Sequence, residues 1–295
     1  MQSFIHFDKI FIQHILQTEN ITVDVVRFDE MHEIVSGNKW FKLQYYLKDA
    51  VNKDFKHIVT FGGAYSNLIV ATAFVCRELN LKCTGIIRGE EAKHLSHTLT
   101  DAKDFGMELI FMSRTEYKRK HGIRQMFEGK KVYFISEGGY GLLGAKGASE
   151  MMNWIDESYT HILGAVGSGT MLAGLIKAAK PHQQIIGINV MKGNENLINQ
   201  VNLLLTQRER KKNYLLLNDY HFGGYAKHPA TLIQFMNHLW QYYQLPTDFV
   251  YNSKTLFATF DLIGKNYFPP GSKVMAIQCG GLQGNYSLPE NILAF

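Results

Sequence analysis

The chain has 295 residues, of which 46% are hydrophobic and 19% charged, a balance typical of a folded globular protein and not of a disordered one. The formal net charge of +5 is a modest excess scattered along the chain, so we expect no nucleic-acid partner. No apolar run approaches the roughly 20 residues of a membrane span, and the N-terminus lacks a secretory signal pattern. We therefore expect a cytoplasmic protein without a membrane partner. Three cysteines without a paired spacing and twelve histidines without a ligand motif predict neither a disulfide frame nor a metal site.

Short apolar, β-branched segments alternate with helical patterns along most of the chain. The predicted strands are 22–28, 57–61, 84–87, 109–112, 132–135, 162–166, 185–190 and 273–277. The predicted helices between and after them are 68–79, 96–105, 145–155, 171–179, 197–205, 229–243 and 254–267. Strands separated by helices of this length indicate parallel sheets joined by right-handed crossovers, so the predicted fold class is α/β.

Lys39 lies where an amine is disfavoured as ammonium. It follows a Ser36-Gly37-Asn38 turn and precedes the amphipathic run 40–47, so we expect it in the first turn of a helix. The positive end of the helix dipole favours the neutral amine there, and a neutral lysine is what covalent chemistry with a carbonyl requires. The alternative is a solvated lysine without a chemical role. Lys42, one turn along, is expected on the helix surface.

Three predicted strands end in glycine clusters, at the edge where open α/β sheets bind ligands. Gly62-Gly63 precedes Ser66 and Asn67, either of which could cap the next helix, while two glycines suggest close approach of the backbone to a ligand. Gly167-Ser168-Gly169-Thr170 offers backbone amides and two hydroxyls to a phosphate. It lacks the lysine of a P-loop and the acidic residue of a dinucleotide site, so a single phosphate is expected. Gly280-Gly281 forms either a plain turn or a wall of the same site.

A reactive lysine, a cradle for one phosphate and several glycine-lined strand ends together indicate a site for pyridoxal 5′-phosphate (PLP). At these positions the chain resembles the family of 1-aminocyclopropane-1-carboxylate (ACC) deaminase and D-cysteine desulfhydrase. The matching motifs, in the family's order over most of the chain, are Gly37-Asn38-Lys39 with Lys42-Leu43, Gly62-Gly63 with Ser66-Asn67, Gly167–Thr170, Phe222-Gly223-Gly224-Tyr225, Thr247-Asp248 with Val250-Tyr251, and Gly280-Gly281. Their joint occurrence is far more specific than any one of them.

The resemblance implies the tryptophan-synthase-β-like PLP fold (fold type II), with two three-layer αβα domains and mostly parallel sheets. Residues 1–45 and 151–295 would form the larger, PLP-binding domain. Residues 46–150 would form a smaller α/β domain that closes over the cofactor. Family members are commonly dimers, so we expect a homodimer that acts on a small amino-acid substrate.

The resemblance also implies roles for individual residues. Lys39 would carry PLP as a Schiff base and move a proton at the substrate α-carbon. Ser66 would contact the substrate carboxylate and take part in proton transfer, and Tyr225 and Tyr251 would face the substrate. Asn67 would hydrogen-bond the 3′-oxygen of the cofactor. The other expected cofactor contacts are Asn38, Val166, Gly167, Ser168, Gly169, Thr170, Asn252 and Gly280.

The chain departs from the family pattern in three places. Leu68 stands where ACC deaminases have Gln and D-cysteine desulfhydrases His, so a polar substrate contact is missing. Asn252 stands where ACC deaminases place Glu on the pyridine nitrogen, and a neutral amide cannot supply that charge. The segment between residues 27–30 and Gly37 is short compared with the family's.

These residues predict PLP-dependent α,β-elimination of a D-cysteine- or D-serine-like amino acid. The products would be a 2-oxo acid and ammonia, with sulfide from cysteine. Asn252 is the reason to prefer this reaction over ring opening of ACC. ACC deaminase is the first alternative, and a PLP-binding protein with little turnover, its pocket weakened at Leu68, is the second. Dinucleotide binding ranks last.

Overall fold

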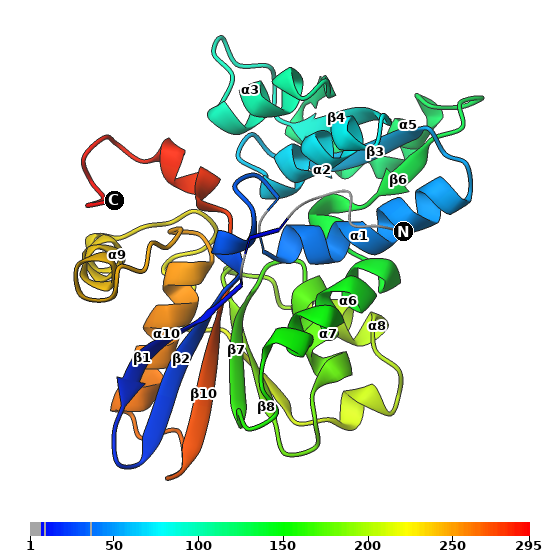
Figure 1. The fold of residues 1–295 in the computed structure, drawn as a ribbon. Helices are drawn as coiled ribbons and strands as arrows, with labels where there is room; N and C mark the ends of the chain where they lie inside the picture. The colour runs from blue at the N-terminus through cyan, green and yellow to red at the C-terminus, as the bar shows by residue number, and fades with distance from the viewer. Residues whose placement is uncertain (1–6, 9, 36) are drawn as a thin grey trace.

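The computed structural model describes residues 7, 8, 10–35 and 37–295, which form two sheets with helix α1 between them (Figure 1). The strands are β1 (Ile12–Gln17), β2 (Ile21–Arg27), β3 (His57–Gly62), β4 (Lys82–Arg88), β5 (Glu108–Met112), β6 (Tyr133–Ile135), β7 (His161–Val166), β8 (Gln184–Asn189), β9 (Tyr214–Leu217) and β10 (Ser272–Gln278). The helices are α1 (Asn38–Asn52), α2 (Asn67–Glu78), α3 (His97–Asp104), α4 (Arg114–Lys118), α5 (Lys120–Gln125), α6 (Leu142–Ser149), α7 (Thr170–Ala178), α8 (Leu197–Leu203), α9 (Ala230–Tyr243) and α10 (Asn252–Gly264).

The larger sheet has six strands in the order β1-β2-β10-β7-β8-β9, and the smaller has four in the order β5-β4-β3-β6. Strand β1 pairs with β2 antiparallel, and the remaining pairs between named strands are parallel. Parallel neighbours need crossover helices, and those helices cover both faces of each sheet (Figure 1). The predicted α/β class with mostly parallel sheets is confirmed.

Alternation along the strands explains how each sheet fills a core on both faces. On β3, Ile58 packs with α1, α2 and α3, whereas Val59 and Phe61 pack on the opposite side with residues of α4 and α5. On β10, Val274 and Met275 likewise belong to different cores. Such runs of buried residues on both faces are what a parallel sheet requires.

Helix α1 belongs to both halves of the molecule. Phe41 packs in the core that α6 and α7 form over the larger sheet. Leu43, Leu47 and Ala50 pack instead in the core of the smaller sheet with α2. The helix that begins beside Lys39 is therefore held from two sides.

Some elements differ from the sequence prediction. Strands β1 and β9 were not predicted, because β1 has weak alternation and both lie at sheet edges, where side chains are only partly buried. The predicted helix 145–155 begins earlier, at Leu142, and after Ser149 it continues as a 3-10 turn, Glu150–Trp154. Ser36, part of the predicted turn before Lys39, lies outside the described residues.

The predicted domains, residues 46–150 and the remainder of the chain, can be compared with the strands that make up each sheet. The smaller sheet is built from strands between residues 57 and 135, and the larger one from strands before 28 and after 160. Helix α6 packs on α7 and α1. The predicted boundaries at residues 46 and 150 stay a prediction. None of the described helices is long and apolar enough to cross a bilayer.

Candidate active site

The start of α1 is locked against the end of β10. Gly37 has a φ of +59°, and a Cβ at this position would lie 1.8 Å from the carbonyl oxygen of Cys279. The same carbonyl accepts a hydrogen bond from the Asn38 amide at 3.1 Å. Only glycine satisfies both the dihedral angle and the close approach. The third glycine-rich strand end is thus in contact with the turn before Lys39, as a wall of one site requires.

Lys39 is the second residue of α1, as predicted, and its amine is held inside the protein. Its Nζ donates a hydrogen bond to Asn38 Oδ1 at 2.5 Å and lies 5.8 Å from the centre of the Tyr251 ring. Burial lowers the pKa of Lys39, and the nearby Cys279 and Asp248 oppose this shift. Desolvation is therefore the main cause of the shift, and not the helix dipole that the sequence pattern suggests. The neutral amine is the form that attacks a carbonyl.

Lys42 is a buried residue of the same site, so the expectation that it lies on the helix surface is wrong. Its side chain is 6% exposed, and its Cβ lies 3.2 Å from where a Cβ on Gly139 would be. Burial, followed by repulsion from Lys39, lowers the pKa of Lys42 to about 7. The signal was present in the sequence, because positions three apart share one helix face. What buries Lys42, however, comes from a turn about 100 residues away.

The loop after β7 forms an anion cradle. Val166 ends the strand, Gly169 has a φ of +82°, and α7 begins at Thr170. Within the described part of the chain the backbone amides of Ser168, Gly169 and Thr170 donate to no protein acceptor. The hydroxyls of Ser168 and Thr170 are 3.0 Å apart, and a Cβ on Gly138 would lie 3.0 Å from Ser168 Oγ. The cradle therefore adjoins the 138–139 turn that also covers Lys42.

The start of α2 presents Ser66 and Asn67. Ser66 is the N-terminal flanking residue of α2, but its hydroxyl makes no capping hydrogen bond. Asn67 Nδ2 donates to the Gly281 carbonyl at 3.2 Å, and its buried Oδ1 has no partner among the described residues. A Cβ on Gly62 would collide with Ser66 and Ile69, so Gly62 is needed for the packing of α2. Gly63 has no such neighbour within 3 Å.

A hydrogen-bonded series links Asp248, Asn252 and Cys279 beside Lys39. Asp248 accepts from the amides of residues 250–252. Asn252 Nδ2 donates to Asp248 Oδ2 at 2.6 Å and to the Gly280 carbonyl at 3.2 Å. Asn252 Oδ1 accepts from the Cys279 amide at 3.0 Å and from its thiol at 3.1 Å. Every hydrogen-bonding position of the Asn252 amide is occupied within the protein, so the expected direct contact with a cofactor has no free donor.

Cys279 is a site residue that the sequence argument missed. Its thiol is buried, burial raises its pKa to about 11, and the charges of Lys39 and Lys42 oppose that shift. At ordinary pH it is a neutral thiol whose hydrogen is directed to Asn252. The glycines that follow it form a recognisable cluster, but a single cysteine carries no signal of its own in a sequence.

Tyr225 and Tyr251 form one side of the site. Their rings are 6.2 Å apart in an edge-on arrangement. Tyr251 precedes α10, whereas Tyr225 lies on a loop with 45% of its surface exposed. Burial raises the pKa of both phenols. Both remain protonated at neutral pH and can donate hydrogen bonds.

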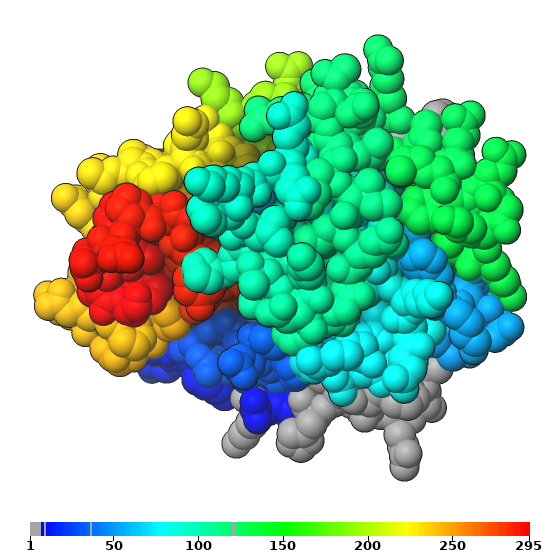
Figure 2. Space-filling model, turned by 90° about the horizontal axis from the view of Figure 1, so that it is seen from above, coloured from blue at the N-terminus to red at the C-terminus, as the bar shows by residue number. Residues whose placement is uncertain are grey.

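The C-terminal segment lies close to the smaller sheet's helices. Seen from above, residues after 282 lie beside the segment around α3 (Figure 2). The rings of Tyr286 and His97 are 5.1 Å apart, and the Asn67–Gly281 hydrogen bond joins the same two parts of the chain. The start of α2 is thereby tied to the loop after β10.

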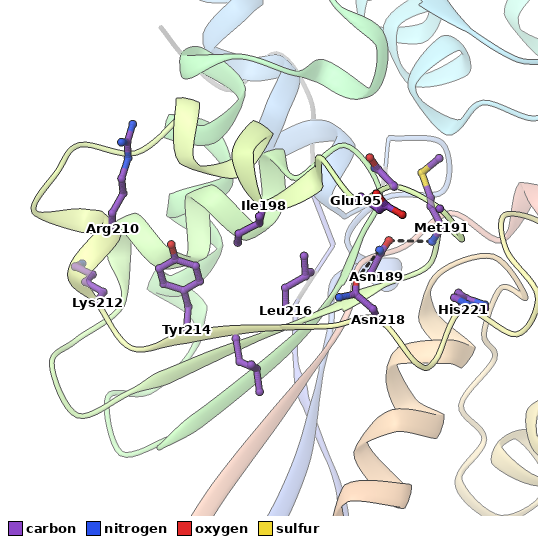
Figure 3. A pocket seen from close by; sticks show the side chains of 13 residues that line it. Asn189, Met191, Glu195, Ile198, Arg210, Lys212, Tyr214, Leu216, Asn218 and His221 are labelled. Carbon is purple, nitrogen blue, oxygen red and sulfur yellow. Dashed lines mark hydrogen bonds between the residues drawn. The ribbon is translucent and has the colours of Figure 1, made fainter.

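A cavity of about 740 Å³ lies elsewhere, beside β8 and β9 (Figure 3). It is lined by none of the predicted site residues. Its cations are already engaged, since Arg210 donates to the Asn202 carbonyl and Lys212 to the carbonyls of Lys177 and Ala179. Lys39 lies outside this cavity.

Comparisons with known proteins agree with this geometry. The family model "Pyridoxal-phosphate dependent enzyme" matches residues 18–280. A Thermotoga maritima protein provisionally named ACC deaminase is 30% identical over 290 residues, covering 91% of each chain. The Arabidopsis thaliana bifunctional D-cysteine desulfhydrase/ACC deaminase is 27% identical, covering 85% of this chain and 70% of the relative. The crystal structure of an ACC deaminase homologue superposes with a TM-score of 0.79 at 23% identity, covering 96% of this chain and 93% of the other.

The described residues fit PLP. The cofactor carries an aldehyde, a phosphate and a phenolic oxygen. The structure places a buried amine of lowered pKa at Lys39, unpaired amides at 168–170, and a buried amide oxygen without a partner at Asn67. The second amine, on Lys42, lies behind the same 138–139 turn that adjoins the cradle, and burial lowers its pKa to about 7. These three groups of the cofactor each have a protein group of the matching kind, whereas the Asn252 amide has no free hydrogen-bonding position for the pyridine nitrogen.

Proposed function

The chain belongs to the pyridoxal-phosphate dependent enzymes, and from this premise we propose that it catalyses α,β-elimination on a small D-cysteine- or D-serine-like amino acid. The substrate would lose its α-proton and its β-substituent, and hydrolysis of the remainder would give a 2-oxo acid and ammonia. Cysteine would release sulfide. When bound, PLP withdraws electrons from the substrate α-carbon.

The observation that carries the proposal is the saturated Asn252 amide. All four of its hydrogen-bonding positions are occupied by Asp248, Gly280 and Cys279. The neighbouring carboxylate, Asp248, already accepts hydrogen bonds from the amides of residues 250–252. By the resemblance, the neutral Asn252 amide thus stands where ACC deaminases carry a carboxylate. Elimination of a good leaving group demands a weaker electron sink than opening a cyclopropane ring does.

Residues of the chain would supply proton transfer and substrate binding. Lys39 would hold PLP covalently and, when displaced by substrate, would take the α-proton as a neutral amine. The free amides at the start of α2 and the uncommitted Ser66 hydroxyl would bind the substrate carboxylate. Tyr225 and Tyr251, both protonated, would donate hydrogen bonds on the substrate side.

The test is an assay of oxo-acid and sulfide release over D-Cys, L-Cys, D-Ser, L-Ser and ACC. We expect a yellow protein whose cofactor borohydride fixes to Lys39, with pyruvate formed from D-Cys or D-Ser. Lys39→Ala is the control and should lose both the fixation and the turnover. A colourless protein to which PLP cannot be restored would refute the proposal.

ACC deaminase is the second candidate, because relatives carry that name at 26–30% identity. Release of 2-oxobutanoate from ACC faster than pyruvate from D-Cys would favour it. Cofactor uptake without product from any amino acid would instead favour a PLP-binding protein with little turnover, the reading that Leu68 suggested. Leu68 is 1% exposed in the core of the smaller sheet.

We further propose that residues 46–150 move as a smaller domain over the cofactor, and that the enzyme is a cytoplasmic homodimer. The two-sheet organisation supports the domain boundaries. Light scattering of the purified protein measures its oligomeric state.

A further inference from the structure

Arg88 is a cation of the site region to which the proposed reaction assigns no role. It is the last residue of β4, so it lies at the carboxyl edge of the smaller sheet, where α/β sheets bind ligands. Its Nη2 is 3.5 Å from where a Cβ on Gly63 would be, beside the loop that leads to Ser66. Its charge also acts on the phenol of Tyr225, which belongs to the other half of the molecule. Arg88 therefore faces the region between the start of α2 and Tyr225.

The fold itself uses little of this guanidinium. Within the described part of the chain Arg88 makes one ion pair, with Glu137 at 3.5 Å, and its Cζ lies 5.7 Å from the centre of the Tyr117 ring. A 3.5 Å contact is longer than a charge-assisted hydrogen bond, which measures about 2.7–2.9 Å. Arginine carries five N–H donors in a planar fork that matches carboxylate or phosphate oxygens. Among the described residues most of these donors have no protein acceptor, so they are open to a ligand.

The substrate's α-carboxylate has another place to bind. The amides of Asn67 and Leu68, at the N-terminus of the 12-residue helix α2, donate to no protein acceptor in the described residues, and the Ser66 hydroxyl makes no capping bond. One carboxylate would occupy these donors. Arg88, held beyond Gly63 by Glu137 and facing Tyr225, is left for a different negative group.

We propose that Arg88 binds a second negative charge at the far end of the substrate side chain, so that the site prefers amino acids with an anionic β-substituent. This inference rests on the proposed elimination. For a β-phosphate, the α-proton passes to Lys39, and the Cβ–O bond breaks with its electron pair leaving on phosphate. The remaining 2-aminoacrylate takes up water to give pyruvate and ammonia, so no oxidant or reductant is required.

Binding is tested first with amino acids that lack a leaving group. Glutamate and glutamine, in both D and L forms, are titrated into the PLP-loaded protein, and the absorbance change of the cofactor gives each Kd. We expect glutamate to bind about tenfold more tightly than glutamine, and Arg88→Gln to abolish that ratio. Arg88→Lys, which keeps the charge but not the fork, should restore part of it.

Turnover and a matched variant complete the test. Pyruvate and phosphate release from O-phosphoserine, compared with serine, should show the same preference in kcat/KM. Glu137→Gln removes the partner of Arg88 and should keep or raise the glutamate preference. If it lowers the preference as much as Arg88→Gln does, the ion pair is only structural and the inference fails.

The possible failures can be told apart. If glutamate and glutamine have the same Kd, or if Arg88→Gln weakens the binding of both by the same factor, the assignment of Arg88 is wrong. The proposed function then still stands. If the loaded protein shows no spectral response to any amino acid, the proposed function fails, and the assignment fails with it. Unchanged cofactor absorbance and thermal unfolding of Arg88→Gln verify that the variant is folded.

Discussion

Replacing Lys42 by Met tests whether a second amine is buried close to that of Lys39. Methionine keeps the length of the side chain and removes the charge. In the native protein burial and repulsion from Lys39 lower the pKa of Lys42 to about 7, whereas in the unfolded chain it is 10.5. The native state of the wild type therefore releases this proton at a lower pH than the unfolded state does.

The sign of the pH effect follows from proton counting. Between pH 7 and 10.5 the unfolded chain binds more protons at this position than the native protein, so the free energy of unfolding rises with pH. At about 1.4 kcal/mol per pKa unit, the full span corresponds to about 5 kcal/mol. Below pH 7 the Lys42 amine is charged in both the native and the unfolded state. The cost of burying the ammonium then lowers the free energy of unfolding in full. Lys42→Met removes this contribution.

The assay is urea unfolding of the cofactor-free protein at several pH values between 6 and 10. The wild type should gain stability across this range relative to Lys42→Met, and the variant should be the more stable protein at pH 6. Lys53→Met, at an exposed lysine at the end of the same helix, is the matched control and should not change the slope. Parallel pH profiles for wild type and Lys42→Met would refute the burial of this amine.

Two further substitutions test backbone and side-chain contacts around Lys39. Gly37→Ala places a Cβ 1.8 Å from the Cys279 carbonyl at a φ of +59°, so we expect a loss of about 3 kcal/mol or more in urea unfolding; Gly264→Ala, in open space at the end of α10, is the control. Asn252→Ala leaves the Cys279 amide and the Gly280 carbonyl without partners, and should cost about 2–4 kcal/mol. A loss below 1 kcal/mol in either case would contradict the contacts described.

Local signals explain what could be predicted from the sequence. The position of Lys39 in the first turn of α1 depends on a glycine turn and an adjacent amphipathic run, both within ten residues. The cradle at 167–170 depends on a strand, a glycine with positive φ and a helix start that follow one another directly. Hydrophobic periodicity and glycine turn signals along the chain are sufficient to predict such features.

Long-range packing explains what could not be predicted. Lys42 is buried by a turn at 138–139, and three of the four hydrogen bonds of the Asn252 amide join it to residues 27 and 28 positions away in sequence. Strands β1 and β9 are edge strands, and their pairing depends on neighbours more than on their own alternation. Burial created by distant contacts reverses what a local pattern suggests about a polar side chain.

Because α1 packs in two hydrophobic cores, a substitution in either core can affect Lys39. Phe41 packs with one half of the protein and Leu43 with the other. These residues are two and four positions from Lys39 on the same helix. A cavity made in either core lets the same helix shift, and a shift of α1 changes the solvation on which the low pKa of Lys39 depends. Substitutions in the core of either sheet are therefore expected to change the pKa of Lys39, because both cores hold helix α1.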